Sequence, residues 1–76
     1  MSTLSILIGR KIREQRKQSD INQENLALAA GIDRSYMGRI ERGEVNLTVD
    51  KLYQLASALN CQVCVLLPDV QDVYHD

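Results

Sequence analysis

The sequence predicts an all-α fold, a compact bundle of five short helices. Apolar residues recur every three or four positions along most of the chain, which is the period of helices that bury one side. Residues that favour helix starts and stops divide this pattern into short segments, and the one proline, Pro68, interrupts none of the first four. The 76 residues are expected to form a single domain over residues 1–76, with a core at about 4–67 and a short tail at 68–76.

The first, fourth and fifth helices follow from apolar spacing and end signals. The first is expected at residues 3–17, with basic side chains between its apolar positions. Thr48 is a favourable N-cap for the fourth helix, and Asn60 is placed to end it because asparagine tolerates the left-handed conformation. A short fifth segment is expected at about residues 63–67, before Pro68. The apolar stripes of the first and fourth helices consist of Leu4, Ile8, Ile12, Val49, Leu52, Leu55, Ala56 and Leu59.

Two helices joined by a very short turn are predicted between these segments. Asn22 and Asp33 are favourable N-caps, because their side-chain oxygens accept hydrogen bonds from backbone N–H groups of the first helical turn. Gly31 ends the first of the two helices, and Gly43 ends the second. Only Ile32 separates the first stop from the next cap, so the two helices must meet at a sharp angle. This is the geometry of a helix-turn-helix.

The charge distribution allows a DNA-binding surface although the net charge is −1 and the pI is about 5.7. Taken alone, an acidic balance argues mildly against a nucleic-acid partner. However, all but one of the nine Lys and Arg residues lie before Glu44, and the C-terminal tail is acidic. A local basic face can therefore exist on an acidic chain. The basic side chains of the first helix are expected to form a solvated face.

Five polar side chains at outward positions of the third helix are the candidate DNA contacts. Arginine forms paired hydrogen bonds with guanine or binds phosphate, serine bonds to a base edge, and tyrosine packs on a thymine methyl group or bonds to a phosphate. The alternative for the arginines is a solvated surface, and a basic residue near a helix end also suits the helix dipole. The five are Arg34, Ser35, Tyr36, Arg39 and Arg42.

A combination of short motifs runs through about residues 8–67. It consists of Ile8-Gly9, Ile12-Arg13, Arg16, Asn22-Gln23-Glu24, Leu26-Ala27, Gly31-Ile32, Ile40-Glu41-Arg42-Gly43 and the helix with Leu52, Leu55, Ala56 and Leu59. Together these motifs resemble the Cro/repressor-type (Xre-like) helix-turn-helix family. The run DRSYMGRIERGEVNLT is similar to the controller proteins of restriction-modification systems, and general regulators of the family carry similar runs. Met37 departs from the usual β-branched residue, and Gly38 departs further because glycine inside a helix costs about 1 kcal/mol relative to alanine.

The resemblance implies a lambda-repressor-like bundle of five helices that binds DNA as a symmetric dimer. It implies base-edge contacts for four side chains, namely Arg34, Ser35, Tyr36 and Arg39. It implies contacts to the phosphate backbone for four others, namely Asn22, Gln23, Arg42 and Asn46. It also implies an internal ion pair between Arg16 and Glu41 that braces the first helix against the third.

A homodimer is expected because a chain this small buries only a limited core by itself. The resemblance places dimerisation at the fourth and fifth helices. The candidate interface residues could equally close the core of the monomer, and the sequence leaves that alternative open. They are Leu66, Leu67, Val70, Val73 and Tyr74.

Cys61 and Cys64 form a C-x-x-C pair, which can indicate metal or redox chemistry. A four-ligand zinc site needs two further ligands, and the one histidine, His75, lies in the tail. Cys61 also stands where the resembled family has a buried aliphatic residue. Packing cysteines are therefore expected rather than a metal site, with a redox switch as the alternative.

These observations predict a sequence-specific transcription regulator that binds double-stranded DNA as a homodimer at a near-palindromic operator. The alternative is an antitoxin-like interaction module that sequesters a partner protein through the acidic, apolar tail after Pro68. No nucleophile–base pair, carboxylate pair or glycine-rich phosphate loop indicates an enzyme, and no cofactor or small-molecule ligand is expected. The apolar stretches are too short for a bilayer and the N-terminus has the reverse order of a signal peptide, so a soluble cytoplasmic protein is expected.

Overall fold

The computed structural model describes residues 2–74, and the regular structure of this part is helical. Met1, His75 and Asp76 lie outside the described residues. Within residues 2–74 there is no β-strand, which confirms the all-α prediction. The elements are α1 (Thr3–Gln18), α2 (Gln23–Ala30), α3 (Arg34–Glu41), α4 (Val49–Ala58), the 3-10 turn η1 (Val63–Leu66) and α5 (Val70–Val73).

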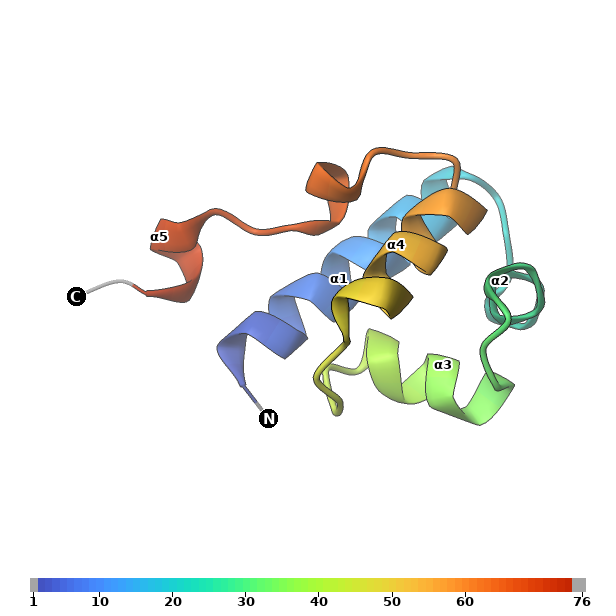
Figure 1. Ribbon diagram of the computed structural model, residues 1–76, viewed down its shortest axis with the longest axis horizontal. Coiled ribbons are helices and arrows are strands. Elements are labelled where there is room, and N and C mark those ends of the chain that lie inside the picture. The colour runs from blue at the N-terminus through green and yellow to red at the C-terminus, as the bar shows by residue number, and fades with distance from the viewer. Residues whose placement is uncertain (1, 75–76) are drawn as a thin grey trace.

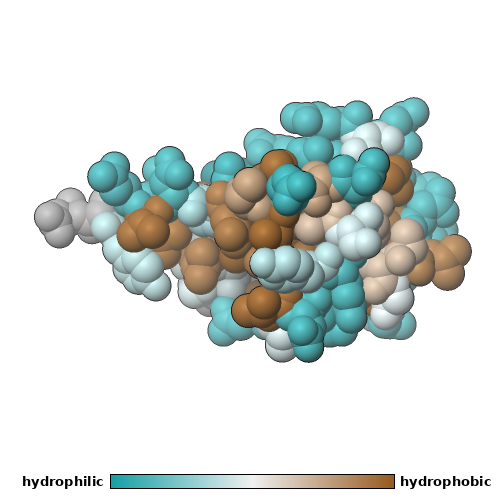
Figure 2. Space-filling view, turned by 45° about the horizontal axis from the view of Figure 1, so that its top comes forward, coloured by the Kyte–Doolittle hydropathy of each residue, from teal (hydrophilic) through white to brown (hydrophobic). Residues whose placement is uncertain are grey.

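Four helices and the 3-10 turn form the body of the protein. α3 packs against both α1 and α2, and α4 packs against α2. η1 lies against α1 and α4 and so covers one side of the bundle (Figure 1). α5 stands apart from this body, near the C-terminal end of the chain (Figure 1). Hydrophobic side chains are visible on the surface at this end and on the adjacent body (Figure 2).

Local capping chemistry sets the helix boundaries as predicted. The side chains of Asn22, Asp33 and Thr48 each accept a hydrogen bond from a backbone N–H in the first turn of the helix that follows. Gly31 has a φ of 69° and ends α2 in the left-handed conformation, and Asn60 has a φ of 54° after α4. Because the turn between α2 and α3 is so short, these two helices form the predicted helix-turn-helix.

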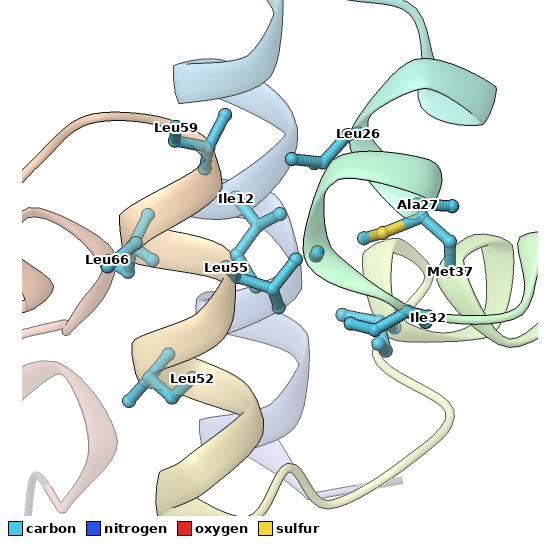
Figure 3. Close-up of a cluster of buried hydrophobic side chains, with 12 residues drawn as sticks. Ile12, Leu26, Ala27, Ile32, Met37, Leu52, Leu55, Leu59 and Leu66 are labelled. Carbon is cyan, nitrogen blue, oxygen red and sulfur yellow. The ribbon is translucent and has the colours of Figure 1, made fainter.

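The core is aliphatic and draws on every element from α1 to η1 (Figure 3). Met37 fills the position where a β-branched residue is usual in the resembled family, and its unbranched side chain adapts to irregular space. Burial of one large apolar side chain contributes roughly 1.5 to 3 kcal/mol. Each element supplies at least one side chain with no exposed surface: Ile12, Leu26, Met37, Leu55 and Leu66.

α1 crosses the C-terminal end of α3 at Gly9. A β-carbon at this position would lie 2.9 Å from the carbonyl oxygen of Glu41 and closer still to that of Ile40. Glycine is required because no other residue lets the two backbones approach so closely. The crossing therefore holds the end of α3, and the residues that follow it, in a fixed position on α1.

The C-terminal segment differs from the prediction of a single fifth helix at residues 63–67. It forms one 3-10 turn, η1, and then the separate short helix α5 after Pro68. Proline disfavours helical geometry in the residue before it, and Leu67 is accordingly extended, with a φ of −105° and a ψ of 131°. Leu66 is fully buried in the core of the monomer, which for this residue is the alternative that the sequence leaves open.

Candidate nucleic-acid interface

One side of α3 is buried in the core, and the other side is exposed to solvent. Met37 and Ile40 point inward, with 0% and 1% of their surface exposed. Arg34, Ser35 and Arg39 are exposed. The helix therefore displays three of its four predicted base-reading side chains together, while its inner side fixes its position on the bundle.

The fourth predicted reader, Tyr36, is half-buried and lines a shallow hollow together with Arg39. The hollow has a volume of about 450 Å³ and includes Lys51 from the first turn of α4. The Lys51 ammonium lies 6.0 Å from the centre of the Tyr36 ring, at the limit of a cation–π contact. Lys51 was not among the predicted contacts, because only the three-dimensional fold brings it next to Arg39.

The hydroxyl of Ser35 is engaged at the start of α3. It donates to the carboxylate of Asp33, which also accepts from the backbone N–H groups of Ser35 and Tyr36. The Ser35 hydroxyl and then the two backbone groups stabilise the ionised carboxylate, and they hold the pKa of Asp33 below its usual value. In this arrangement Ser35 presents an acceptor oxygen, rather than a donor, to the outer surface.

An ion pair beneath the exposed side connects α1 with the end of α3. Arg16 Nε and Nη2 donate to the two carboxylate oxygens of Glu41 at 2.6 and 3.0 Å, which is the brace that the resemblance implies. The side chains of Arg16 and Glu41 are 12% and 4% exposed. Arg16 Nη1 also donates to the backbone carbonyl of Ile21 at 3.0 Å. The side-chain amide of Gln23 donates to Glu41 at 3.1 Å. Gln23 is a predicted phosphate contact, and one of its two side-chain amide hydrogens is therefore used inside the protein.

Gly38 makes room for a guanidinium group on the surface of α3. A β-carbon at this position would lie 3.1 Å from Nη1 of Arg42 and 3.6 Å from Oε1 of Gln23. A second shallow hollow, with a volume of about 360 Å³, extends from these residues to Arg34 and Ser35. The departure from the usual pattern at Gly38 thus lets the Arg42 side chain lie close against the helix beside Gln23.

The two asparagines predicted to contact phosphate share one hydrogen-bonding arrangement. Asn22 Oδ1 accepts from the backbone N–H of Asn25 at 2.7 Å, and Asn46 Oδ1 accepts from the hydroxyl of Ser5 at 2.5 Å. Because each carbonyl oxygen is used inside the protein, each exposed side chain offers its NH2 group to the outside. An NH2 group is a suitable donor to a phosphate oxygen.

The two cysteines are free thiols, with Cys61 half-buried and Cys64 exposed. Burial, with a smaller contribution from the neighbouring Cys64, raises the pKa of the Cys61 thiol above its usual value. A raised pKa lowers the thiolate fraction and hence the reactivity. In the part of the chain from residue 2 to residue 74, no group of three or more His, Cys, Asp or Glu side chains could hold a metal ion, and His75 lies outside this part.

The helix-turn-helix and most of the core coincide with a known sequence family. Residues 12–66 match the family model described as "Helix-turn-helix" (HTH_3). The chain belongs to this helix-turn-helix family. The membership confirms the family that the sequence motifs resemble. The matched residues cover α2, α3, α4 and η1 completely.

Individual helix-turn-helix relatives include control proteins. Control protein C.SmaI of Serratia marcescens is 39% identical over 61 residues, which are 80% of this chain and 73% of the relative. Control protein C.BamHI of Bacillus amyloliquefaciens is 34% identical over 62 residues, 80% of this chain and 76% of the relative. The crystal structure of the restriction-modification controller protein C.AhdI from Aeromonas hydrophila is 37% identical and has a TM-score of 0.79, covering 82% of this chain and 94% of that one. The predicted similarity to restriction-modification controllers is thereby confirmed.

The helix-turn-helix family membership identifies the general function. The chain is a DNA-binding transcription regulator and not an enzyme, because its relatives are control proteins and transcriptional regulators. Within residues 2–74, each helix is too short or too polar to cross a membrane.

Proposed function

We propose that this protein is the controller of a restriction-modification system and binds a near-palindromic operator as a homodimer. The exposed side of α3 carries this proposal, because Arg34, Ser35 and Arg39 project there from a helix whose inner side is anchored in the core. In a helix-turn-helix the second helix reads base edges in the major groove, while phosphate contacts set its register. Two copies would bind half-sites about one helical turn, ~10 bp, apart. A regulator of this kind would act in the cytoplasm.

We assign the phosphate contacts to donors around the edge of this side of α3. The NH2 groups of Asn22 and Asn46 point outward, and Gln23 retains one amide hydrogen that no intramolecular bond uses. Arg42 supplies a full positive charge beside Gln23. Lys51 adds a second cation next to Tyr36. Together these groups would hold α3 in one register on the DNA backbone, independent of base sequence.

The roles of Arg39 and Arg42 are separated by replacing each with alanine. Arg39→Ala is expected to lose about 1 to 3 kcal/mol at one base position and to relax the preference there, because a bidentate base contact is removed. Arg42→Ala is expected to weaken binding to all sequences alike and to reduce the salt slope by about 0.9, because one phosphate contact is removed. Selection of bound duplexes from a random DNA pool measures the preference, and titration at two salt concentrations measures the slope. An unchanged preference for Arg39→Ala would show that Arg39 does not read bases.

The controller role is tested with the sequence motif from that selection. The motif is expected upstream of the protein's own gene, beside genes for a methyltransferase and an endonuclease. The similarity to C.SmaI, C.BamHI and C.AhdI supports this expectation. A motif elsewhere, together with a toxin-like reading frame beside the gene, would instead favour the antitoxin-like alternative.

We place the dimer interface on the apolar surface around the C-terminal segment. Leu67, Val70 and Tyr74 are 41%, 73% and 75% exposed, and Val73 is half-buried. α5 stands off the body at this end of the molecule (Figure 1), and it has no element among its main packing partners. A second copy of the chain would bury these side chains.

The interface assignment predicts different effects for two neighbouring charges on α5. Val70→Asp is expected to raise the dimer dissociation constant at least ~10-fold, because a carboxylate would be desolvated in an apolar contact. Gln71→Asp adds the same charge at the adjacent exposed position and is expected to change the dissociation constant little. Sedimentation velocity over a concentration series measures both. Equal behaviour of the two variants would place the interface elsewhere.

A further inference from the structure

The carboxylate of Glu44 lies between two of the arginines that we place on DNA. Arg42 Nε donates to Glu44 Oε2 at 2.7 Å, and Arg42 Nη2 is 3.5 Å from Oε1. Arg39 Nε lies 3.7 Å from Glu44 Oε1. One acidic side chain thus contacts both a proposed base reader and a proposed phosphate contact. The sequence patterns did not indicate Glu44, because the contacts depend on how the chain turns after α3.

The backbone fixes the position of Glu44. The backbone N–H of Glu44 donates to the carbonyl of Arg39 at 3.0 Å, and that of Gly43 donates to the carbonyl of Ile40 at 3.0 Å. With Gly43 at a φ of 75°, these two bonds form the Schellman ending of α3. A β-carbon on Gly43 would lie 2.6 Å from Cα of Ile6, so this turn is packed tightly against α1. Glu44 therefore projects from a rigid turn rather than from a loose loop.

Fold stability does not account for a carboxylate at this place. The C-terminal end of a helix carries partial negative charge, so an acidic side chain there has the unfavourable sign. The side chains of Glu44, Arg39 and Arg42 are 37%, 53% and 60% exposed, and exposed ion pairs contribute little to stability. The hydrogen bond from Arg42 lowers the pKa of Glu44, so the carboxylate is ionised at neutral pH. It places a negative charge on the surface that approaches phosphates.

We propose that Glu44 is a positioning residue that determines the specificity of DNA binding, an inference that rests on the proposed DNA-binding surface. Its nearest contact with each of Arg39 and Arg42 is made at Nε, and Arg42 Nη2 donates a second, longer hydrogen bond. The hydrogen bonds fix the direction of the Arg42 guanidinium group. The ion pair at Nε favours one direction of the Arg39 guanidinium group and leaves its Nη1 and Nη2 for the paired hydrogen bonds that a guanine requires. Glu44 thus orients the arginines without using the atoms that read the operator.

The same arrangement acts against binding to non-matching DNA. On the operator, both arginines reach their targets in the orientation that Glu44 maintains. On other sequences, binding depends on flexible basic side chains moving to the nearest phosphates. Such movement separates the arginines from Glu44 and leaves its carboxylate unpaired near the phosphate backbone, where like charges repel. Glu44 therefore weakens non-specific binding more than operator binding.

Glu44→Gln tests this inference, because it removes the charge and keeps the size of the side chain. The probes are a duplex selected from a random pool by the wild-type protein and a scrambled duplex of the same composition. We expect the affinity for the scrambled duplex to rise about 3- to 10-fold and its salt slope to become steeper by about one counterion. The affinity for the selected duplex is expected to change by less than about 3-fold, since Arg39 and Arg42 keep their targets there. The ratio of the affinity for the selected duplex to the affinity for the scrambled duplex is therefore expected to fall.

Glu14→Gln is the matched control, because it changes the net charge equally at an exposed position of α1. This control is expected to leave the affinity ratio unchanged, and thermal unfolding is expected to show that both variants are folded. An unchanged ratio for Glu44→Gln, or an equal fall for Glu14→Gln, would overturn the role of Glu44 alone. A wild-type protein that binds both duplexes equally would overturn the proposed function itself, and this inference with it.

Discussion

Replacing Glu41 by alanine is expected to lower the free energy of unfolding by about 3 to 5 kcal/mol. The substitution leaves the Arg16 guanidinium without its carboxylate in a place where its side chain is only 12% exposed. A buried charge without a partner has lost its hydration, and no ion pair compensates for that loss. The side-chain amide of Gln23 also loses its acceptor. Urea denaturation followed by circular dichroism measures the change.

Two further variants make this result interpretable. Glu14→Ala removes an exposed carboxylate from α1 and is expected to change the stability by no more than about 0.5 kcal/mol. The double variant Arg16→Met with Glu41→Leu replaces both charges by apolar groups of similar size and is expected to recover most of the loss. A loss below about 1 kcal/mol for Glu41→Ala would mean that water reaches Arg16 and that the ion pair is not a brace.

Replacing Leu66 by alanine is expected to destabilise the protein by about 2 to 5 kcal/mol. Leu66 has no exposed surface and belongs to η1, which packs against both α1 and α4, so truncation opens a cavity between these elements. Val65→Ala is the matched control in the same turn. Val65 is 43% exposed, and its truncation is expected to cost about 0.5 kcal/mol or less. Equal effects of the two variants, measured by thermal unfolding, would contradict the assignment of Leu66 to the core.

The elements that the sequence predicts correctly are those set by local chemistry. Asn22, Asp33 and Thr48 accept backbone hydrogen bonds within their own first turns, so their roles do not depend on distant residues. Gly31 and Asn60 likewise adopt the left-handed conformation that their types allow. For the same reason the outward positions of α3, and hence most of the candidate site, could be predicted from the helical period.

The features that escaped prediction depend on contacts between distant segments. Leu66 and Leu67 are adjacent leucines, and only the packing of η1 on α1 and α4 decides which one is buried. Lys51 belongs to α4, and only the fold brings it to Tyr36. Glu44 follows Arg42 closely in the sequence, but its contacts with Arg39 and Arg42 depend on the turn that ends α3 and packs against α1. Hydrophobic period and capping residues contain no information on such distances.

The division of α3 into an anchored inner side and an exposed outer side makes the protein a scaffold for retargeting. The side chains of Arg34, Ser35 and Arg39 contribute nothing to the buried core. A library randomised at these three positions should therefore remain folded while sampling many recognition sequences. By the same reasoning, a few substitutions during evolution could move such a regulator to a new promoter while its architecture stayed unchanged.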